Sequence, residues 1–133
     1  MIVKQTPFIT LSYFPETELV EVEWLAATSD MTDKEFQENV GLQNEVVLKH
    51  RPKKILAKTL EMEYTISPKE QEKHNDVMLP TFKAVELEKL AIVVSHDIFT
   101  QVSISQLLDD DTAASYQSNY FEDITSAMEW LNK

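Results

Sequence analysis

The sequence predicts an α/β fold: a mixed β-sheet that opens with a β-hairpin, continues in alternating βα units and is covered by four helices. Three observations carry this prediction. Two runs rich in β-branched and aromatic residues lie near the start, two helix-start signals follow, and a continuously apolar run at 90–94 is typical of a buried strand. With 133 residues, 43% of them hydrophobic, the chain is long enough for one sizeable core, so we expect one domain over residues 1–133.

The first two strands are expected at 8–14 and 19–25, on either side of a turn at Pro15. The second run alternates between apolar residues and carboxylates, which is the period-two pattern of a strand with one dry face and one wet face. The dry face consists of Val20, Val22 and Trp24, and the face expected to meet water carries Glu21 and Glu23.

A helix should begin at Thr32, because Thr32 and Glu35 have the spacing of a capping box, in which each side chain accepts a hydrogen bond from the other residue's backbone amide. Basic residues ahead of Pro52 mark the end of this helix. Gly41, the only glycine of the chain, lies in its middle, where it costs about 1 kcal/mol relative to alanine. We therefore expect a neighbouring element to pack closely against Gly41.

A strand at 55–60 leads to a second helix, which begins with another capping box at Ser67 and Glu70 and has Pro68 at its first position. Pro80 removes a backbone donor and should kink or divide this helix. The inward stripe is expected to be polar first and apolar later: Gln71, His74, Asn75, Met78, Phe82 and Val85.

The last third of the chain predicts two further βα units. After the apolar strand at 90–94, residues from Ser95 onward offer caps for a third helix that runs to Leu108. A strand at 116–121 follows, and Asp123 can cap a short final helix. This order implies strands joined by right-handed crossovers in one mixed sheet.

Composition excludes several classes of function. Twelve Lys and Arg against 23 Asp and Glu give a net charge of -11, which repels polyanions and argues against nucleic-acid binding. The chain has no cysteine, and therefore no disulfide, thiolate zinc site or thiol nucleophile. No stretch is apolar enough to span a bilayer and the first residues lack the pattern of a secretion signal, so we expect a cytoplasmic protein with no membrane insertion. One basic cluster is interpreted as a helix C-terminus followed by a turn: Lys49, His50, Arg51, Lys53 and Lys54.

Three segments resemble the SpoIIAA-like branch of the STAS/SEC14-type superfamily: ISPKEQ at 66–71, VVSHDIFTQVSISQ at 93–106 and YFEDITSAMEWL at 120–131. The resemblance spans nearly the whole chain and implies a STAS-type fold. The last segment follows the F-x-D-x-x-x-A-x-x-W-L ending of those proteins at Phe121, Asp123, Ala127, Trp130 and Leu131. This ending is a packing motif, so it bears on the fold and not on chemistry.

STAS anti-sigma-factor antagonists carry a phosphorylatable serine in an Asp-Ser-Ser-Gly-like turn at the start of the second helix. This chain has AKTLEMEYTISP there, without the glycine and the paired serines, so Ser67 is only a positional analogue. Two interpretations of Ser67 stay open. It is a plain helix N-cap, which a Ser-Pro start explains, or a phosphorylation switch, because free helix-start amides tolerate a phosphate.

Catalytic and metal-binding constellations are scarce in the sequence. The three histidines, His50, His74 and His96, have no metal-ligand spacing, and a single glycine excludes a phosphate-binding loop or a dinucleotide fingerprint, so no cofactor is expected. Ser67 and His74 lie about two helical turns apart, too far for direct proton transfer. Ser67, Gln71, His74 and Asn75 form either a small polar pocket or a group of hydrogen-bonded structural residues. Glu61 and Glu63 are interpreted as solvated charges, and so are Asp109 to Asp111.

Three functions stay open. The first, favoured by the STAS resemblance, is a non-catalytic binding or regulatory module that docks a protein partner. The second, implied by the SEC14 side of the resemblance, is a carrier of a small apolar ligand or lipid. The third is an undescribed hydrolase. Any partner or ligand is expected to contact Tyr64, Ser67, Gln71 or His74, in the loop at 60–67 and the start of the second helix.

A homodimer is also expected. The strand at 116–121 has the sequence of an exposed edge strand. A kink at Pro80 would expose Met78, Leu79 or Phe82 for contact with a second copy.

Overall fold

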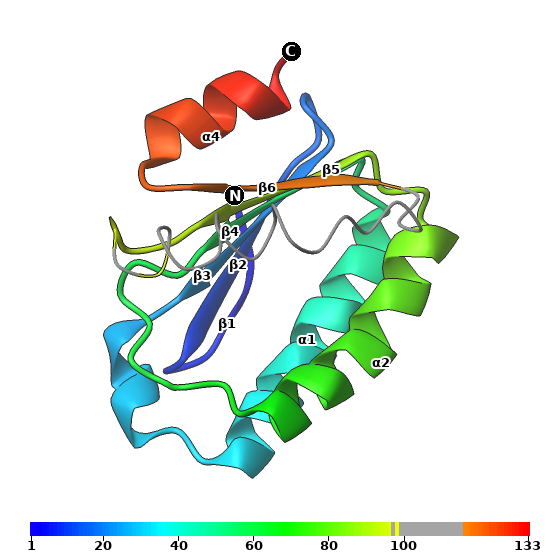
Figure 1. Ribbon diagram of the computed structural model, residues 1–133. Coiled ribbons are helices and arrows are strands. Elements are labelled where there is room, and N and C mark those ends of the chain that lie inside the picture. The colour runs from blue at the N-terminus through cyan, green and yellow to red at the C-terminus, as the bar shows by residue number, and fades with distance from the viewer. Residues whose placement is uncertain (97, 99–115) are drawn as a thin grey trace.

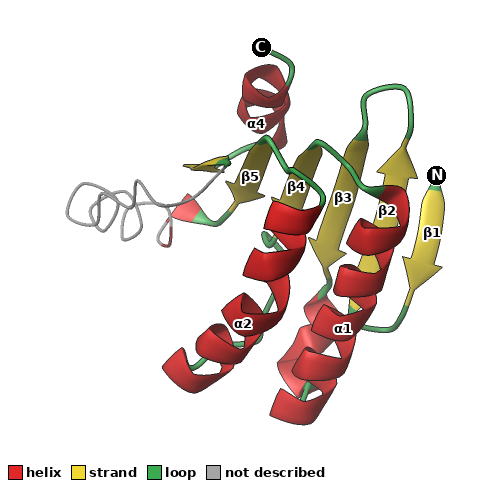
Figure 2. Ribbon diagram, turned by 90° about the vertical axis from the view of Figure 1, so that its right-hand side faces the viewer, coloured by secondary structure: helices red, strands yellow, loops and turns green. Residues whose placement is uncertain are grey.

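The computed structural model describes residues 1–96, 98 and 116–133. They form a six-stranded mixed sheet, with α1 and α2 on one face and α4 on the other (Figure 1 and Figure 2). In chain order the elements are β1 (Ile2–Gln5), β2 (Ile9–Phe14), β3 (Leu19–Trp24), the 3-10 helix η1 (Ala26–Asp30), α1 (Asp33–His50), β4 (Lys54–Lys58), α2 (Pro68–Ala84), β5 (Lys89–Val93), β6 (Gln117–Phe121) and α4 (Ile124–Leu131).

The spatial order of the strands is the same as their order in the chain. β1, β2 and β3 pair antiparallel, and β3 to β6 pair parallel. The predicted α/β architecture with a mixed sheet, the β2–β3 hairpin and alternating units is therefore confirmed. The described residues contain three α-helices, because the helix predicted between Ser95 and Leu108 lies almost wholly outside them.

The sequence prediction missed β1. This strand is four residues long, mostly exposed and at the edge of the sheet, and its register with β2 shifts between Ile2 and Lys4. A short strand with no buried face has no apolar alternation, which is the signal on which strand prediction depends.

Two hydrophobic layers hold the sheet between the helices. The face toward α1 and α2 carries the alternating apolar residues of β2 and β3, and the opposite face packs on α4. The larger layer is centred on Ile9, Leu11, Val20, Val22, Ile55, Phe36, Val40, Val47, Met78 and Phe82, and the smaller on Leu19, Leu56, Ala91, Val93, Ala127 and Leu131. Glu21 and Glu23 lie on the α4 side of β3, half-buried, and Glu21 is 3.5 Å from the Lys58 ammonium.

Three polar contacts set the register of α1 against α2. Gln37 Nε2 donates to Glu70 Oε1 at 2.9 Å, the Thr81 hydroxyl donates to Asn44 Oδ1, and Arg51 Nη2 donates to the Ala84 carbonyl at 2.9 Å. Gln37 and Asn44 lie seven residues apart on α1, which is about two helical turns, and Arg51 is the C-cap residue that follows α1. Since their partners on α2 also rise in number, the two helices run parallel, as Figure 2 shows.

The helix starts follow the sequence prediction closely. Thr32 and Glu35 form the predicted capping box at α1, and Asp123 Oδ1 accepts from the Ser126 amide at 2.7 Å at the start of α4. At α2 only half of the predicted box exists. Ser67 Oγ accepts from the Glu70 amide at 3.2 Å, but the Glu70 carboxylate binds Gln37 instead of reaching back to Ser67.

Two predictions concern the helix interiors, and the one about Gly41 is wrong. A Cβ on Gly41 would meet no atom within 4 Å, so no neighbouring element packs closely there. α2 continues through Pro80 to Ala84, so Pro80 does not divide it, and the kink stays a prediction. Pro80 is itself exposed, so the carbonyl that loses its helical donor lies on the solvent side of the helix, where water can satisfy it.

The final helix matches the packing motif found in the sequence. Phe121 and Trp130 lie with ring centroids 5.7 Å apart, and Ala127 and Leu131 are buried. Lys89 fixes the other end of α4, because its ammonium donates to the Trp130 carbonyl at 2.9 Å and lies 5.2 Å from the centroid of the Trp130 ring.

Candidate functional site

The loop at 60–67 connects β4 to α2 and contains no strand or helix (Figure 1). Leu60 and Glu61 lie in a turn, in which the Met62 amide donates to the Thr59 carbonyl at 3.2 Å. From Met62 onward the side chains alternate between two environments, which is the pattern of an extended chain. Met62, Tyr64 and Ile66 are half-buried against the larger hydrophobic layer, whereas Glu61, Glu63, Thr65 and Ser67 are exposed. We call residues 60–67 the docking segment.

Two contacts fix the docking segment to the domain. The Glu63 amide donates to the hydroxyl of Thr28 at 2.8 Å, and that hydroxyl in turn donates to the Leu25 carbonyl at 2.6 Å. Thr28 is fully buried in η1. A buried, doubly bonded hydroxyl is a rigid attachment point, so the segment is held at its middle.

Tyr64 provides the second attachment. Its ring stacks on Phe36 of α1 with centroids 4.9 Å apart, and its hydroxyl donates to the Asp33 carboxylate at the start of α1. Burial of the phenol and its contact with Asp33 raise the pKa of Tyr64, so it stays protonated throughout the physiological range. The ring centroids of Phe36 and Trp24 lie 5.4 Å apart. Phe36 therefore links the docking segment to the end of β3.

Ser67 and Glu70 form the junction between the docking segment and α2. Ser67 is exposed and its hydroxyl oxygen serves as the N-cap acceptor. Glu70 is only 3% exposed, and its carboxylate accepts from Gln37 and lies 3.5 Å from the Lys73 ammonium. The buried carboxylate is thus paired, as a charge in this position must be.

His74 lies beside Phe36 on the inner side of α2, with ring centroids 6.5 Å apart. Its Nδ1 is 3.1 Å from Asn75 Oδ1, and Gln71 Nε2 donates to the same oxygen at 3.0 Å. Burial lowers the pKa of His74 and outweighs the opposing effect of the hydrogen bond to Asn75. Gln71 is exposed, so its predicted place on the inward stripe is wrong and Glu70 is the buried residue of that turn.

The four predicted site residues are only partly brought together. Tyr64 and His74 meet through Phe36, and Gln71 and His74 meet through Asn75. Within the described residues, no hydrogen bond joins Ser67 to His74, Gln71 or Tyr64. The supporting contacts of Thr28 and Asp33 do not follow from the sequence, because neither residue has a local pattern that reveals a partner some 30 positions away.

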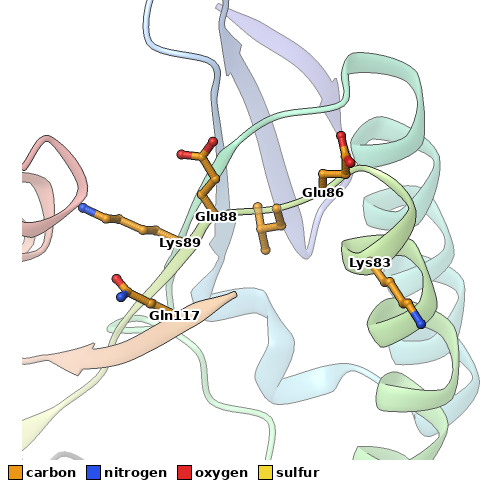
Figure 3. A pocket seen from close by; sticks show the side chains of 6 residues that line it. Lys83, Glu86, Glu88, Lys89 and Gln117 are labelled. Carbon is orange, nitrogen blue, oxygen red and sulfur yellow. The ribbon is translucent and has the colours of Figure 1, made fainter. Parts of the chain in front are cut away.

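Two surface depressions lie outside the docking segment. One, of about 500 Å³, lies between the starts of α1 and α2 and is lined by Asp33, Lys34, Gln37, Glu38, Glu70 and Lys73. The other, of about 700 Å³, lies beside the start of β5 (Figure 3). Figure 3 shows that Lys83 and Lys89 point in different directions there, and Lys89 is already bound to α4. The side chains around this depression therefore do not converge on one point.

The other two histidines, His50 and His96, each have a contact of their own. His96 is 2.8 Å from Glu122, and His50 stacks on Tyr13 at the C-terminal end of α1, where burial and then Lys49 lower its pKa. Among the described residues, no three His, Asp or Glu side chains could hold a metal ion.

Only part of the predicted dimer surface is exposed in the structure. Met78 and Phe82 are 0% and 3% exposed and belong to the core, so they are not available to a second copy. Leu79 is 46% exposed, and β6 lies at the edge of the sheet. α2 is not divided at Pro80, which is why its apolar stripe stays against the sheet.

None of the described helices is long and apolar enough to cross a membrane. Comparison with known proteins gives no further guidance: no family model, no curated protein and no solved structure matches the chain.

Proposed function

We propose that the protein is a non-catalytic binding or regulatory module, and that its docking surface is the docking segment with the first turns of α2. The observation that carries this proposal is the alternation of half-buried and exposed side chains along residues 62–67, which attaches one side of the segment to the core and leaves the other side exposed. A segment held in this way loses little conformational entropy when a partner binds it, which favours affinity.

The polar groups near the segment support a binding role over a hydrolytic one. Nucleophilic catalysis requires a nucleophile and a base within hydrogen-bond reach of each other. Ser67 Oγ accepts from a backbone amide, and His74 Nδ1 lies against Asn75. No contact among the described residues pairs the two, so the hydrolase hypothesis has no observation in its favour.

A carrier of an apolar ligand requires a concave and mostly apolar site. Both depressions described above are lined mainly by charged side chains. The STAS resemblance stays a prediction, and within it the docking segment corresponds to the region where antagonists meet their partners.

The proposal predicts a protein partner that depends on Thr65. Thr65→Arg places a bulky cation on the exposed side of the segment without touching the buried side. Native mass spectrometry of the protein purified from its own cells should show a co-purifying polypeptide with wild type, and a loss of at least tenfold with Thr65→Arg. Thr125→Arg, the same change at an exposed position of α4, is the matched control and should retain the partner. A retained lipid in place of a polypeptide, or equal loss with both variants, would contradict the proposal.

A regulatory role for Ser67 has its own test. Ser67→Ala should cost about 1 kcal/mol of stability through the lost cap, whereas Ser67→Asp keeps a cap and places a negative charge where a phosphate would lie. If Ser67 is a switch, the affinity of the partner changes in Ser67→Asp and not in Ser67→Ala at matched stability. Equal affinity for all three proteins would leave Ser67 as a cap only.

A further inference from the structure

We propose that the outer face of α1 and α2, the face turned away from the sheet, binds the same face of a second copy of this chain, with α1 of each copy lying over α2 of the other. The centre of this outer face lies at Gly41 and Val77, beyond the first turns of α2 that belong to the proposed docking surface. Its exposed apolar side chains, the order of large and small residues along the two helices, and the balance of its charges lead to this inference.

The outer face carries apolar side chains that remain exposed. Among the described elements, none lies over the side of α1 and α2 that faces away from the sheet (Figure 2). Leu48 on α1 is 43% exposed and Val77 on α2 is 38% exposed. Pro80 and Ala84, which follow Val77 on α2, are also exposed. An apolar patch of this kind across two neighbouring helices is typical of a surface that binds another polypeptide.

Gly41 lies level with Val77. On α1, Gly41 lies between the two residues that bind Glu70 and Thr81, and on α2 Val77 lies between Glu70 and Thr81. Val77 comes seven residues after Glu70 and four before Thr81, so all three lie on the side of α2 that faces α1. The open space over Gly41 is therefore next to an exposed valine of the neighbouring helix.

Large and small residues follow each other in opposite order along the two helices. On α1, the small Gly41 is followed seven residues later by the large Leu48. On α2, the large Val77 is followed seven residues later by the small Ala84. Since the two helices run parallel and Gly41 is level with Val77, Leu48 is also close to the level of Ala84.

This order makes the outer face complementary to itself. A two-fold axis parallel to the helices places α1 of one copy over α2 of the other at the same level, as a symmetric contact requires. Val77 of each copy then enters the space over Gly41 of the other, where a Cβ would meet no atom within 4 Å. Leu48 of each copy covers Ala84 of the other in the same way. A glycine that weakens the interior of α1 thus leaves room for the second copy.

The charges of the outer face also permit two copies to approach. The exposed charged side chains of α1 and α2 are equal numbers of acids and bases: Asp33, Glu38, Glu45, Glu72 and Asp76, and Lys34, Lys49, Lys69, Lys73 and Lys83. In the whole chain, acidic residues outnumber basic ones by 23 to 12. A second copy therefore meets less electrostatic repulsion on these helices than on an average surface of the protein.

The size of the outer face predicts a weak dimer. α1 and α2 have 18 and 17 residues, so each is about 26 Å long and about 10 Å wide. Their common outer face then measures about 500 Å² per copy, and a dimer buries about 1,000 Å² in total, near the lower limit of specific interfaces. We expect a reversible dimer that is half-formed at about 100 µM protein.

Sedimentation velocity of the full chain between about 5 µM and about 500 µM measures this association. Gly41→Val should weaken it about tenfold or more, because the new side chain meets Val77 of the other copy. The fold should not suffer, since valine favours a helix more than glycine does. Adding Val77→Ala to Gly41→Val should restore the dimer, because the space has then moved to the other helix. Ala26→Val, a similar enlargement at an exposed position of η1, is the matched control and should leave association unchanged.

Cysteine pairs test the parallel arrangement, since the chain has no cysteine of its own. Under oxidising conditions, a mixture of Gly41→Cys and Val77→Cys proteins should form a disulfide-linked dimer, whereas Gly41→Cys alone should not. A protein that stays monomeric at about 500 µM, or a dimer that Gly41→Val does not weaken, would overturn the proposed interface. A linked dimer from Gly41→Cys alone, and none from the mixture, would overturn the parallel arrangement.

Discussion

Gly41 lies in the middle of α1, and a Cβ built on it would meet no atom within 4 Å. A glycine inside a helix is usually explained by close approach of another element or by a positive φ. Neither applies here, since the residue has no close neighbour and the positive-φ residues of the described chain are Glu18, Arg51 and Glu86. Gly41 therefore leaves the interior of α1 less stable than an alanine at the same position would make it.

Gly41→Ala should stabilise the protein by about 1 kcal/mol, because alanine has the higher helix propensity and its methyl group enters open space. The midpoint of urea unfolding should rise with no change in the slope. Val40→Ala is the contrasting control, since Val40 is fully buried and its truncation should destabilise by about 1–3 kcal/mol. A loss of stability in Gly41→Ala would mean that an unseen contact fills this position.

At the scale of elements, the α1–α2 interface combines apolar packing with three polar contacts. Apolar contacts alone permit one helix to slide along another, whereas a hydrogen bond between particular residues does not. Glu70 and Thr81 each have a partner on α1, and the Ala84 carbonyl accepts from Arg51, the C-cap residue of α1. The contact between Gln37 and Glu70 positions the first turn of α2, and with it the end of the docking segment.

Thr81→Val tests this role with little change of shape. The variant removes the hydroxyl that donates to Asn44 and should cost about 1–2 kcal/mol, since Thr81 is 6% exposed and its partner loses a donor. Thermal unfolding monitored by circular dichroism measures the loss. Thr125→Val, the same change at an exposed position of α4, should alter stability by less than about 0.5 kcal/mol. Equal effects from the two variants would show that the Thr81–Asn44 contact does not contribute.

The elements that the sequence predicts correctly are those with local signals. The capping residues Thr32, Ser67 and Asp123 act on amides three positions ahead, and the alternation in β3 reports one buried face. The prediction fails where the partner is distant in sequence. Glu70 looks like a capping residue, but α1 brings Gln37 to it from 33 positions away, and Glu70 is buried in place of Gln71.

The candidate site shows the same division. Its position in the chain and the cap at Ser67 follow from sequence, but its attachment does not. Thr28 and Asp33 reach the docking segment only because η1 and the start of α1 fold back beneath it. Tertiary contacts of this kind leave no periodicity in a single sequence.

At the scale of the whole molecule, burial of histidine makes the stability of the fold depend on pH. The pKa of His74 lies below the usual 6.5 in the folded protein, and so does that of His50. In the unfolded chain both imidazoles take up a proton as the pH falls through 6.5, before the folded forms do. Their contribution is therefore present above this pH and is lost as the pH falls through the lower folded pKa.

We expect the free energy of unfolding to decrease between about pH 7.5 and about pH 5.5, and His74→Gln to make this decrease smaller. Urea unfolding at both pH values measures the difference. His50→Gln should have the smaller effect of the two, because His50 is more accessible to solvent than His74. An unchanged decrease in His74→Gln would show that the ring is protonated in the folded state as readily as in the unfolded chain.

The strand order has a consequence for how the chain is made. Among the described residues, each strand after β1 pairs with the strand that precedes it in the sequence, so none of these six strands must wait for a later one to fill a gap between existing neighbours. During synthesis, the hairpin of β2 and β3 can form first and each later strand can add to the newest edge as it leaves the ribosome. Because new strands are added at one edge of the sheet only, fewer wrong strand pairings can form while the chain is being synthesised.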